Sequence, residues 1–134
     1  MPDGKDKEGT ERREFVRVNV VVPVRYSFLD MNGQRLPPGL SEGATTNLSA
    51  AGMLLQGRLG DVAWAQELLL QRMAVAVSVM LPTDMEPVKT IARAAWVESI
   101  DPATRRCNLG LMFREITRED QDRLFHFIIR SQLG

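Results

Sequence analysis

The chain has 134 residues, 44% apolar and 25% charged, which is typical of one globular domain with a hydrophobic core. It carries 17 basic and 17 acidic residues, so its formal net charge is zero. This balance argues against a nonspecific DNA binder and against a protein held on an anionic membrane, because both need a basic field. A local cationic cluster would still suffice for a small anionic ligand.

The cysteine content and the first residues bear on the compartment. A single cysteine cannot form an intramolecular disulfide and suits a reducing environment. The first ten residues are polar, unlike a signal peptide, and no apolar run approaches membrane-spanning length. We therefore expect a cytoplasmic protein without membrane insertion.

Residues 1–11 mix acids, lysines and glycines, which predicts a disordered tail. Three arginines follow at once, in Arg12-Arg13-Glu14-Phe15-Val16-Arg17. A guanidinium group offers five donors in a planar fork that fits phosphate oxygens and the O6/N7 edge of guanine, and its flat face stacks on a base. The cluster is typical of a clamp for an anionic, planar ligand, although solvated surface arginines would give the same pattern.

Alternating apolar residues predict strands after this cluster. The even-numbered positions from Val18 to Phe28 are all valine, tyrosine or phenylalanine, so one continuous strand with one apolar face is expected. Two short strands are expected over 43–48 and 52–56, joined by three small residues.

The stretch over 60–73 has a different period. Asp61 could cap a helix, and apolar residues recur after it at helical spacing: Val62, Ala65, Leu68, Leu69 and Met73. We expect an inserted helix near 60–73, which either packs its apolar face on the rest of the domain or docks a partner.

Alternation returns over 74–81, 89–98 and 106–114 and predicts three further strands, of which the second has no assignable inner face. Thr117 and Asp120 match a capping box, and a C-terminal helix is expected with the buried stripe Leu124, Phe125, Ile128 and Ile129. This order of elements indicates a mainly β fold, a small antiparallel barrel with a C-terminal helix, in a single domain over 12–134.

The sequence offers little for catalysis. His126 is the one histidine, and Cys107 alternates with Leu109 and Leu111 as a buried, inert thiol would. No acidic pair stands at catalytic spacing, and no spacing typical of metal ligands is present. We expect no enzymatic activity, no metal and no cofactor.

A second polar motif lies between the two short strands. The amide of Asn47 suits the edge of a base, Ser49 adds a small hydroxyl, and Gly52 permits a left-handed turn or the close approach of a ligand to the backbone. Asparagine, serine and glycine also form ordinary turns, so this motif alone does not distinguish a ligand-binding site from a structural turn.

Taken together, Arg13-x-x-x-Arg17 and Asn47-x-Ser49-x-x-Gly52 resemble the signature of the PilZ domain family, RxxxR followed by [D/N]xSxxG. Arg12 matches an additional arginine that often precedes the motif, and the later strands and closing helix follow the family order. The resemblance covers about residues 12–131. It implies a six-stranded antiparallel split β-barrel with helical additions. The inserted helix near 60–73 is a departure from the family pattern, in which a short link is expected there.

The resemblance also implies a function, the binding of cyclic di-GMP, a bacterial second messenger, without chemistry on it. Arg12, Arg13 and Arg17 would bind phosphates and guanine edges, and Asn47 and Ser49 would contact a guanine from the barrel side, beside Gly52. A further candidate is Arg93, which would stack on a base. Ordering a chain segment costs roughly 1–2 kcal/mol per residue, so the arginine arm is expected to be mobile when empty and to close on binding.

Three functions remain to be separated. The first is an effector that passes the cyclic di-GMP signal to a protein partner in motility, biofilm or exopolysaccharide control. The second is a PilZ-like adaptor that binds proteins and no nucleotide, which the intact motifs argue against. The third, a barrel for single-stranded nucleic acid, conflicts with zero net charge and 6% aromatic residues. One or two nucleotides per site, and a monomer or a homodimer, are left open.

Overall fold

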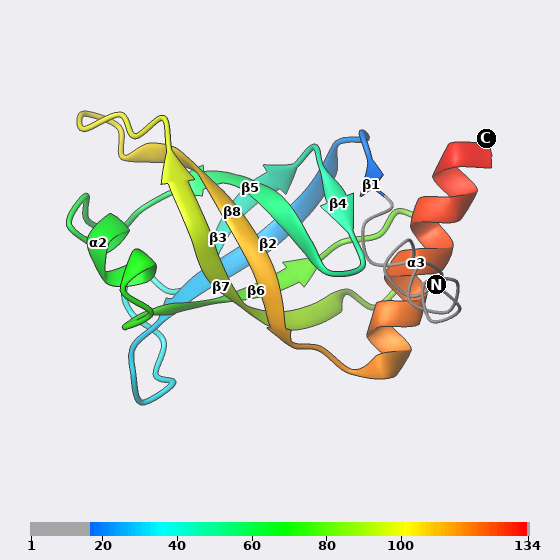
Figure 1. Cartoon of the computed structure of the whole chain (residues 1–134), viewed down its shortest axis with the longest axis horizontal. Helices are drawn as coiled ribbons and strands as arrows, with labels where there is room; N and C mark the ends of the chain where they lie inside the picture. Colours follow the sequence, from blue (N-terminus) through cyan, green and yellow to red (C-terminus); the bar gives the residue numbers. More distant parts are fainter. Residues whose placement is uncertain (1–16, 134) are drawn as a thin grey trace, which may run out of the picture.

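The computed structural model describes residues 17–133, which form a mainly antiparallel sheet with two helices (Figure 1). The elements in chain order are β1 (Arg17–Val18), β2 (Val22–Leu29), β3 (Ser41–Thr45), β4 (Leu48–Ser49), β5 (Gly52–Arg58), α2 (Trp64–Leu69), β6 (Ala74–Val79), β7 (Val88–Glu98), β8 (Arg106–Glu115) and α3 (Arg118–Leu133). The predicted tail over 1–11 lies outside the described residues.

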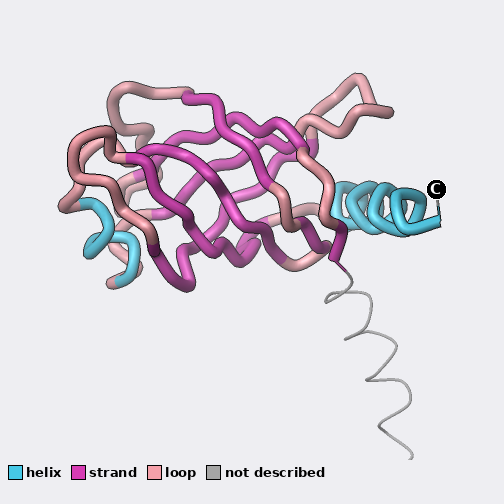
Figure 2. Tube along the Cα trace, turned by 90° about the horizontal axis from the view of Figure 1, so that it is seen from above, coloured by secondary structure: helices cyan, strands magenta, loops and turns pink. Residues whose placement is uncertain are grey.

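Six strands close into an antiparallel barrel, and two short strands extend it at one rim. The strand order is β1-β4-β5-β3-β2-β6-β7-β8, and β5 also pairs with β8, which closes the barrel. The extra strands are β4, which pairs with β5, and β1, which pairs with β4. Two perpendicular views place α2 at one end of the barrel and α3 at the other (Figures 1 and 2). The predicted barrel with a C-terminal helix and one further helix is confirmed.

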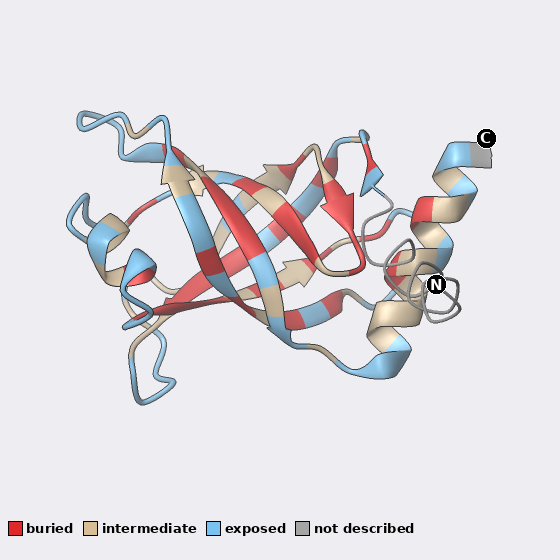
Figure 3. Cartoon of the chain, viewed as in Figure 1, coloured by how far each residue is buried: buried red, intermediate tan, exposed pale blue. Residues whose placement is uncertain are grey.

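The barrel interior is filled by the alternating apolar residues that the sequence predicts (Figure 3). On β2 the even-numbered residues from Val22 to Phe28 are all buried, and on β8 Cys107, Leu109 and Leu111 are buried. Full burial of one large apolar side chain contributes roughly 1.5–3 kcal/mol to folding. This shared interior fixes the register of the strands, because a slip of one residue would turn each apolar face outward.

The predicted single strand from Val18 to Phe28 is in fact two strands. Val18 pairs with Leu48 of β4, whereas β2 pairs with β3 and β6. The chain changes partner over 19–21, and within this link Val21 is 74% exposed. The apolar alternation continues through the break because Val18 and Val22 both face the core, so the pattern alone gave no sign of it.

The inserted helix is present but shorter than predicted, because α2 covers only Trp64–Leu69. In the turn before the helix, the carboxylate of Asp61 accepts a hydrogen bond from the backbone N–H of Ala63 at 2.9 Å. Gln71 has a φ of 63°, which ends the helical turn. Leu68 is fully buried, and the Trp64 ring lies 5.3 Å from the Phe28 ring in an edge contact. This apolar face of α2 therefore packs on the barrel end.

A β-bulge explains why β7 has no uniform inner face in the sequence. From Val88 to Ala94 the even-numbered residues are buried. Ala94 pairs with Leu111 and Trp96 with Gly110, so the register shifts at Ala95. After the shift the even-numbered side chains lie outside, with Trp96 42% exposed. The alternation reverses within one strand, and this makes both faces look mixed.

Tyr26 lies inside the barrel and binds β5. Its hydroxyl accepts a hydrogen bond from the Arg58 N–H at 2.7 Å and donates one to the Arg58 carbonyl at 3.2 Å. Two glycines make room for the ring: a Cβ on Gly57 would lie 2.8 Å from the Tyr26 oxygen, and one on Gly43 would lie 2.9 Å from a ring carbon. Burial raises the pKa of Tyr26 above its ordinary value, against the opposing effect of the Arg58 hydrogen bond.

We predict that Tyr26 titrates at higher pH in the folded protein than in the denatured chain. It is the single tyrosine, so tyrosinate absorbance reports it directly. The folded pKa of Tyr26 lies above the ordinary value of 10.0. The protonated phenol therefore contributes its full stabilisation below pH 10.0, and this stabilisation is lost as the pH rises through the folded pKa. Two superimposable titration curves would contradict the buried, hydrogen-bonded phenol.

Candidate functional site

Arg17 and Asn47 meet at the rim of the barrel where β1 and β4 pair. Arg17 Nη1 donates a hydrogen bond to Asn47 Oδ1 at 3.1 Å, and Arg17 is opposite Ser49 in the strand register. Arg17 is exposed, and among residues 17–133 no carboxylate pairs with it. The structure therefore brings together one residue from each sequence motif, and within residues 17–133 the guanidinium uses one of its five donors, on Asn47.

The backbone of Asn47 is held from inside the barrel. Thr45 is fully buried, and its hydroxyl donates to the Asn47 carbonyl at 3.0 Å and accepts from the Asn47 N–H at 3.3 Å. The same carbonyl accepts a hydrogen bond from the Leu54 N–H at 2.9 Å. Because the main chain is fixed on both sides, the side-chain amide of Asn47 is presented at a defined position on the rim.

Ser49 shapes the turn that follows. It is 1% exposed, and its hydroxyl accepts hydrogen bonds from the N–H groups of Ala51 and Gly52 and donates to the Gly52 carbonyl. These bonds occupy the hydroxyl and cap backbone groups that would otherwise lack partners. The contact with a guanine predicted for Ser49 is not tested by the structure, which shows Ser49 as the residue that holds the turn.

Gly52 permits a close approach of backbone to backbone. A Cβ at this position would lie 2.3 Å from the carbonyl oxygen of Leu111 on β8. The neighbouring Ala51 carbonyl accepts a hydrogen bond from the Phe113 N–H at 2.8 Å. The close approach that the sequence suggested for a ligand is made here by β8, which fixes the turn against the barrel wall.

Helix α3 binds both parts of the site, which sequence reasoning missed. The side-chain amide of Gln132 donates to the Arg17 carbonyl at 3.0 Å, and that of Gln121 donates to the Ala50 carbonyl at 3.1 Å. Both glutamines share one helical face with the fully buried Leu124 and Ile128. Extending the predicted apolar stripe by one turn in each direction would have found them.

Arg93 lies on the outer wall next to this turn. It is exposed on β7, and its Nη2 lies 3.4 Å from the Met112 sulfur. Met112 is opposite Arg93 on one side and Gly52 on the other, so these three residues form one row across β7, β8 and β5. One row further along β8, the Trp96 ring covers Gly110. The wall beside the turn therefore combines a guanidinium group with exposed apolar surface.

Of the predicted site residues, Arg12 and Arg13 lie outside the described residues. Arg17, Asn47, Ser49 and Gly52 come together at the rim, and Arg93 lies two strands away from the turn. Within residues 17–133, no group of three potential metal ligands is found, and no helix is long and apolar enough to cross a membrane. Cys107 is buried, and this burial raises the pKa of its thiol, which fits a structural role.

The arrangement is suited to a planar anion. Guanidinium groups bind phosphate oxygens through two parallel hydrogen bonds, and they stack on bases. The amide of Asn47 can bond the edge of a base, and the apolar wall of Met112 and Trp96 can contact its face. The fold and this rim define a small closed β-barrel module.

The sequence model of the PilZ domain matches residues 11–130, and the chain belongs to the PilZ domain family. The match spans both motifs, the barrel and most of α3. PilZ domains are ligand-binding receptor domains. Comparison with curated proteins gives no match.

Solved structures share the fold at low identity. The inhibitor of motility MotI/DgrA of Bacillus subtilis is 23% identical with a TM-score of 0.64, over 91% of this chain and 52% of that one. The PilZ domain of YcgR from Escherichia coli, solved with c-di-GMP, is 14% identical with a TM-score of 0.54, over 91% and 92%. PlzA of Borreliella burgdorferi, in complex with c-di-GMP, is 9% identical with a TM-score of 0.53, over 100% and 58%. The chain thus spans about half the length of the inhibitor of motility.

We predict that Gly52→Ala strongly destabilises the barrel. The added Cβ would lie 2.3 Å from the Leu111 carbonyl oxygen, and because this oxygen is a backbone atom that cannot rotate away, β5 and β8 must separate. The free energy of unfolding, measured by chemical denaturation, should fall by about 3 kcal/mol.

Gly33→Ala is the matched control. Gly33 has a φ of +78° but no atom within 4 Å of the added Cβ, so the substitution costs only backbone strain of about 1–2 kcal/mol. Equal losses for the two variants would show that the contact between Gly52 and β8 is unimportant.

Proposed function

We propose that this protein is a cyclic di-GMP effector whose arginine arm, residues 12–17, closes over the nucleotide against the rim of the barrel. The observation that carries the proposal is the hydrogen bond between Arg17 and Asn47, which joins the end of the arm to the Asn-x-Ser-x-x-Gly turn. The c-di-GMP named for the solved structures of YcgR and PlzA supports the same ligand.

Each group has a role in this proposal. Arg13 and Arg17 bind phosphates and guanine edges, Arg12 adds a third cation, and Asn47 bonds a guanine edge. Ser49 and Gly52 act by holding Asn47 in place, as their contacts with Ala51 and Leu111 support. Arg93 stacks on a base from the neighbouring wall, for which it is exposed and within one strand of Met112. No bond of the nucleotide is made or broken, so no catalytic group is needed.

The energetics favour a dependence on several arginines. A charge-assisted hydrogen bond contributes about 1.5–3 kcal/mol, whereas micromolar affinity corresponds to about 8 kcal/mol. Loss of two guanidinium groups would therefore remove most of the affinity. Closure of the arm changes the surface at the rim, and a protein partner that reads this surface would receive the signal. Such a partner would act in the cytoplasm, in control of motility, biofilm or exopolysaccharide.

We predict that Arg13→Ala and Arg17→Ala each abolish calorimetric binding of cyclic di-GMP and leave the thermal midpoint of the empty protein nearly unchanged. The thermal midpoint of Arg17→Ala should hardly change because Arg17 is exposed and, within the described residues, its side chain bonds only Asn47. Arg58→Ala is the control, because Arg58 is an exposed arginine at the far end of β5 from Gly52.

Full binding by both arginine variants would contradict the proposed site. A large loss of thermal stability would instead make these arginines structural. If the unsubstituted protein does not bind cyclic di-GMP at all, the PilZ-like adaptor becomes the better account. Linear GMP dinucleotide and a single-stranded oligonucleotide, titrated in parallel, separate cyclic di-GMP recognition from general binding of nucleic acid.

A further inference from the structure

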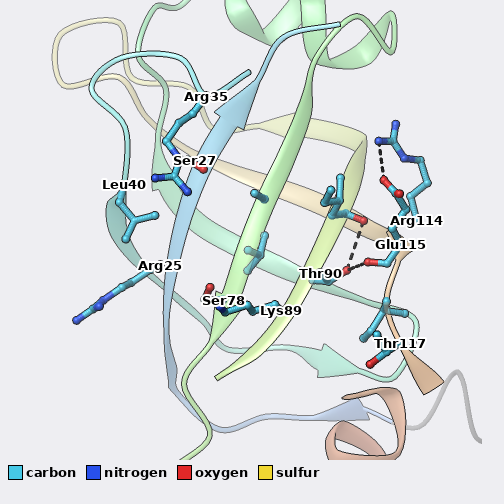
Figure 4. Close-up of a pocket in the computed structure, with 14 residues that line it drawn as sticks. Arg25, Ser27, Arg35, Leu40, Ser78, Lys89, Thr90, Arg114, Glu115 and Thr117 are labelled. Atoms are coloured by element: carbon cyan, nitrogen blue, oxygen red, sulfur yellow. Dashed lines mark hydrogen bonds and ion pairs between the residues drawn. The ribbon is translucent and has the colours of Figure 1, made fainter. Parts of the chain in front are cut away.

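A groove with a volume of about 760 Å³ crosses the outer face of β2, β6 and β7 (Figure 4). Its floor consists of two rows of side chains across these strands: Arg25, Ser78 and Lys89 in one, and Ser27, Ala76 and Ile91 in the other. Small residues on the central strand keep the middle of the floor low. Adjacent strands lie about 4.8 Å apart, so the floor is about 10 Å wide, the width of one extended peptide with its side chains.

The walls of the groove come from two segments distant in sequence. Arg35 and Leu40, in the loop after β2, form one wall, and residues 114–117, where β8 leads into α3, form the other. Leu40 is 51% exposed, and Ile91 and Ile116 are partly buried. The groove therefore offers apolar contacts along its length.

Positive charge predominates around this groove. Its lining includes Arg25, Arg35, Lys89 and Arg114 but only one acid, Glu115, which lies 3.2 Å from Arg114. Within residues 17–133, the other three cations have no ion-pair partner. Figure 4 shows Arg35 directed toward Ser27 and Lys89 beside Ser78, whereas Arg25 and Arg114 point outward at opposite sides. The cations are thus spread over the floor and the walls of the groove.

A buried hydroxyl in the floor lacks a partner. Ser27 is 1% exposed, and its Oγ has no hydrogen bond among the described residues. Buried polar groups are normally hydrogen-bonded, so an unpaired one needs an explanation. Arg35 is exposed and lines the same groove, and Figure 4 shows its side chain directed toward Ser27, so a shift of nearby side chains would bring the hydroxyl within reach of a bound group.

This groove shares no residue with the proposed cyclic di-GMP site. Around the six-stranded barrel, β6 is separated from β5 by two strands in either direction, β2 and β3 on one side and β7 and β8 on the other. The β6 part of the groove floor therefore lies across the barrel from the Ser49–Gly52 turn, whereas Ile91 at the β7 edge of the floor is two residues from Arg93.

We infer that this groove binds an extended, acidic and partly apolar peptide segment of a partner protein. A single phosphate would need donors that converge on one point, whereas these cations are spread over the floor and both walls, with the apolar Ile91, Leu40 and Ile116 between them. This pattern matches alternating acidic and apolar side chains. The unpaired hydroxyl of Ser27 can donate to a carboxylate or a peptide carbonyl. This inference does not depend on nucleotide binding.

The test is an NMR titration of the ¹⁵N-labelled full chain with an octapeptide of alternating glutamate and leucine. Saturable shifts are expected at the amides of Ser27, Ala76, Ser78 and Lys89. The double variant Arg35→Glu and Lys89→Glu should bind about tenfold more weakly or worse, because opposite charges become like charges. A double variant with Arg58→Glu and Arg106→Glu, a neighbouring pair of exposed arginines outside the groove, should bind as the unsubstituted protein does.

Three results would overturn the inference. The first is that a peptide with glutamine in place of every glutamate binds as tightly as the acidic peptide. The second is that the acidic peptide shifts no amide resonances, or shifts only those outside the groove. The third is the same set of shifts produced at similar concentration by inorganic phosphate or a short oligonucleotide, which would identify a general anion site. The dispersion of the NMR spectrum shows whether each variant is folded.

Discussion

The structure depends on the close docking of the Ser49–Gly52 turn against β8. No side chain fits between Gly52 and the Leu111 carbonyl, and the hydroxyl of Ser49 binds the backbone that turns there. This contact lies at the seam where β5 and β8 close the barrel. It also sets the position of Asn47, which accepts a hydrogen bond from Arg17. One local constraint thus closes the fold and assembles the rim, and α3 fastens both parts through Gln121 and Gln132.

Zero net charge does not mean that the surface is electrically uniform. In the sequence, arginines gather before and within β1, and in the structure a second group of cations lines the groove over β2, β6 and β7. Some acids are paired with other cations, as where Arg123 of α3 pairs with Asp84 at 3.1 Å and with Asp120 at 2.9 Å. A closed barrel has one continuous outer surface, on which different strands can carry different sites. In our proposals a nucleotide binds at the rim beside β1 and β4, and a partner peptide binds in the groove over β2, β6 and β7.

Much of the fold could be predicted because one interior imposes a period of two on β2 and β8, and a helical stripe on α3. The sequence did not predict the places where a strand changes its pairing partner or turns its other face to the core. The link between Val18 and Val22 and the bulge at Ala95 arise from pairing, which single-strand patterns do not record. Both motifs were visible in sequence, but the buried role of Ser49 required the turn geometry. The cationic groove was not predictable, since Arg25, Ser78 and Lys89 become neighbours only through the strand order.

The central claim is that the end of the arginine arm and the docked turn form one binding surface. The most direct measurement follows the Arg17 side-chain Nε–H resonance and the backbone amides of residues 47–52 while cyclic di-GMP is added to labelled protein. Our account predicts that these signals shift together along one saturation curve, while the amides of β2 and β6 stay unchanged. Saturable binding that leaves Arg17 and this turn unperturbed would contradict it.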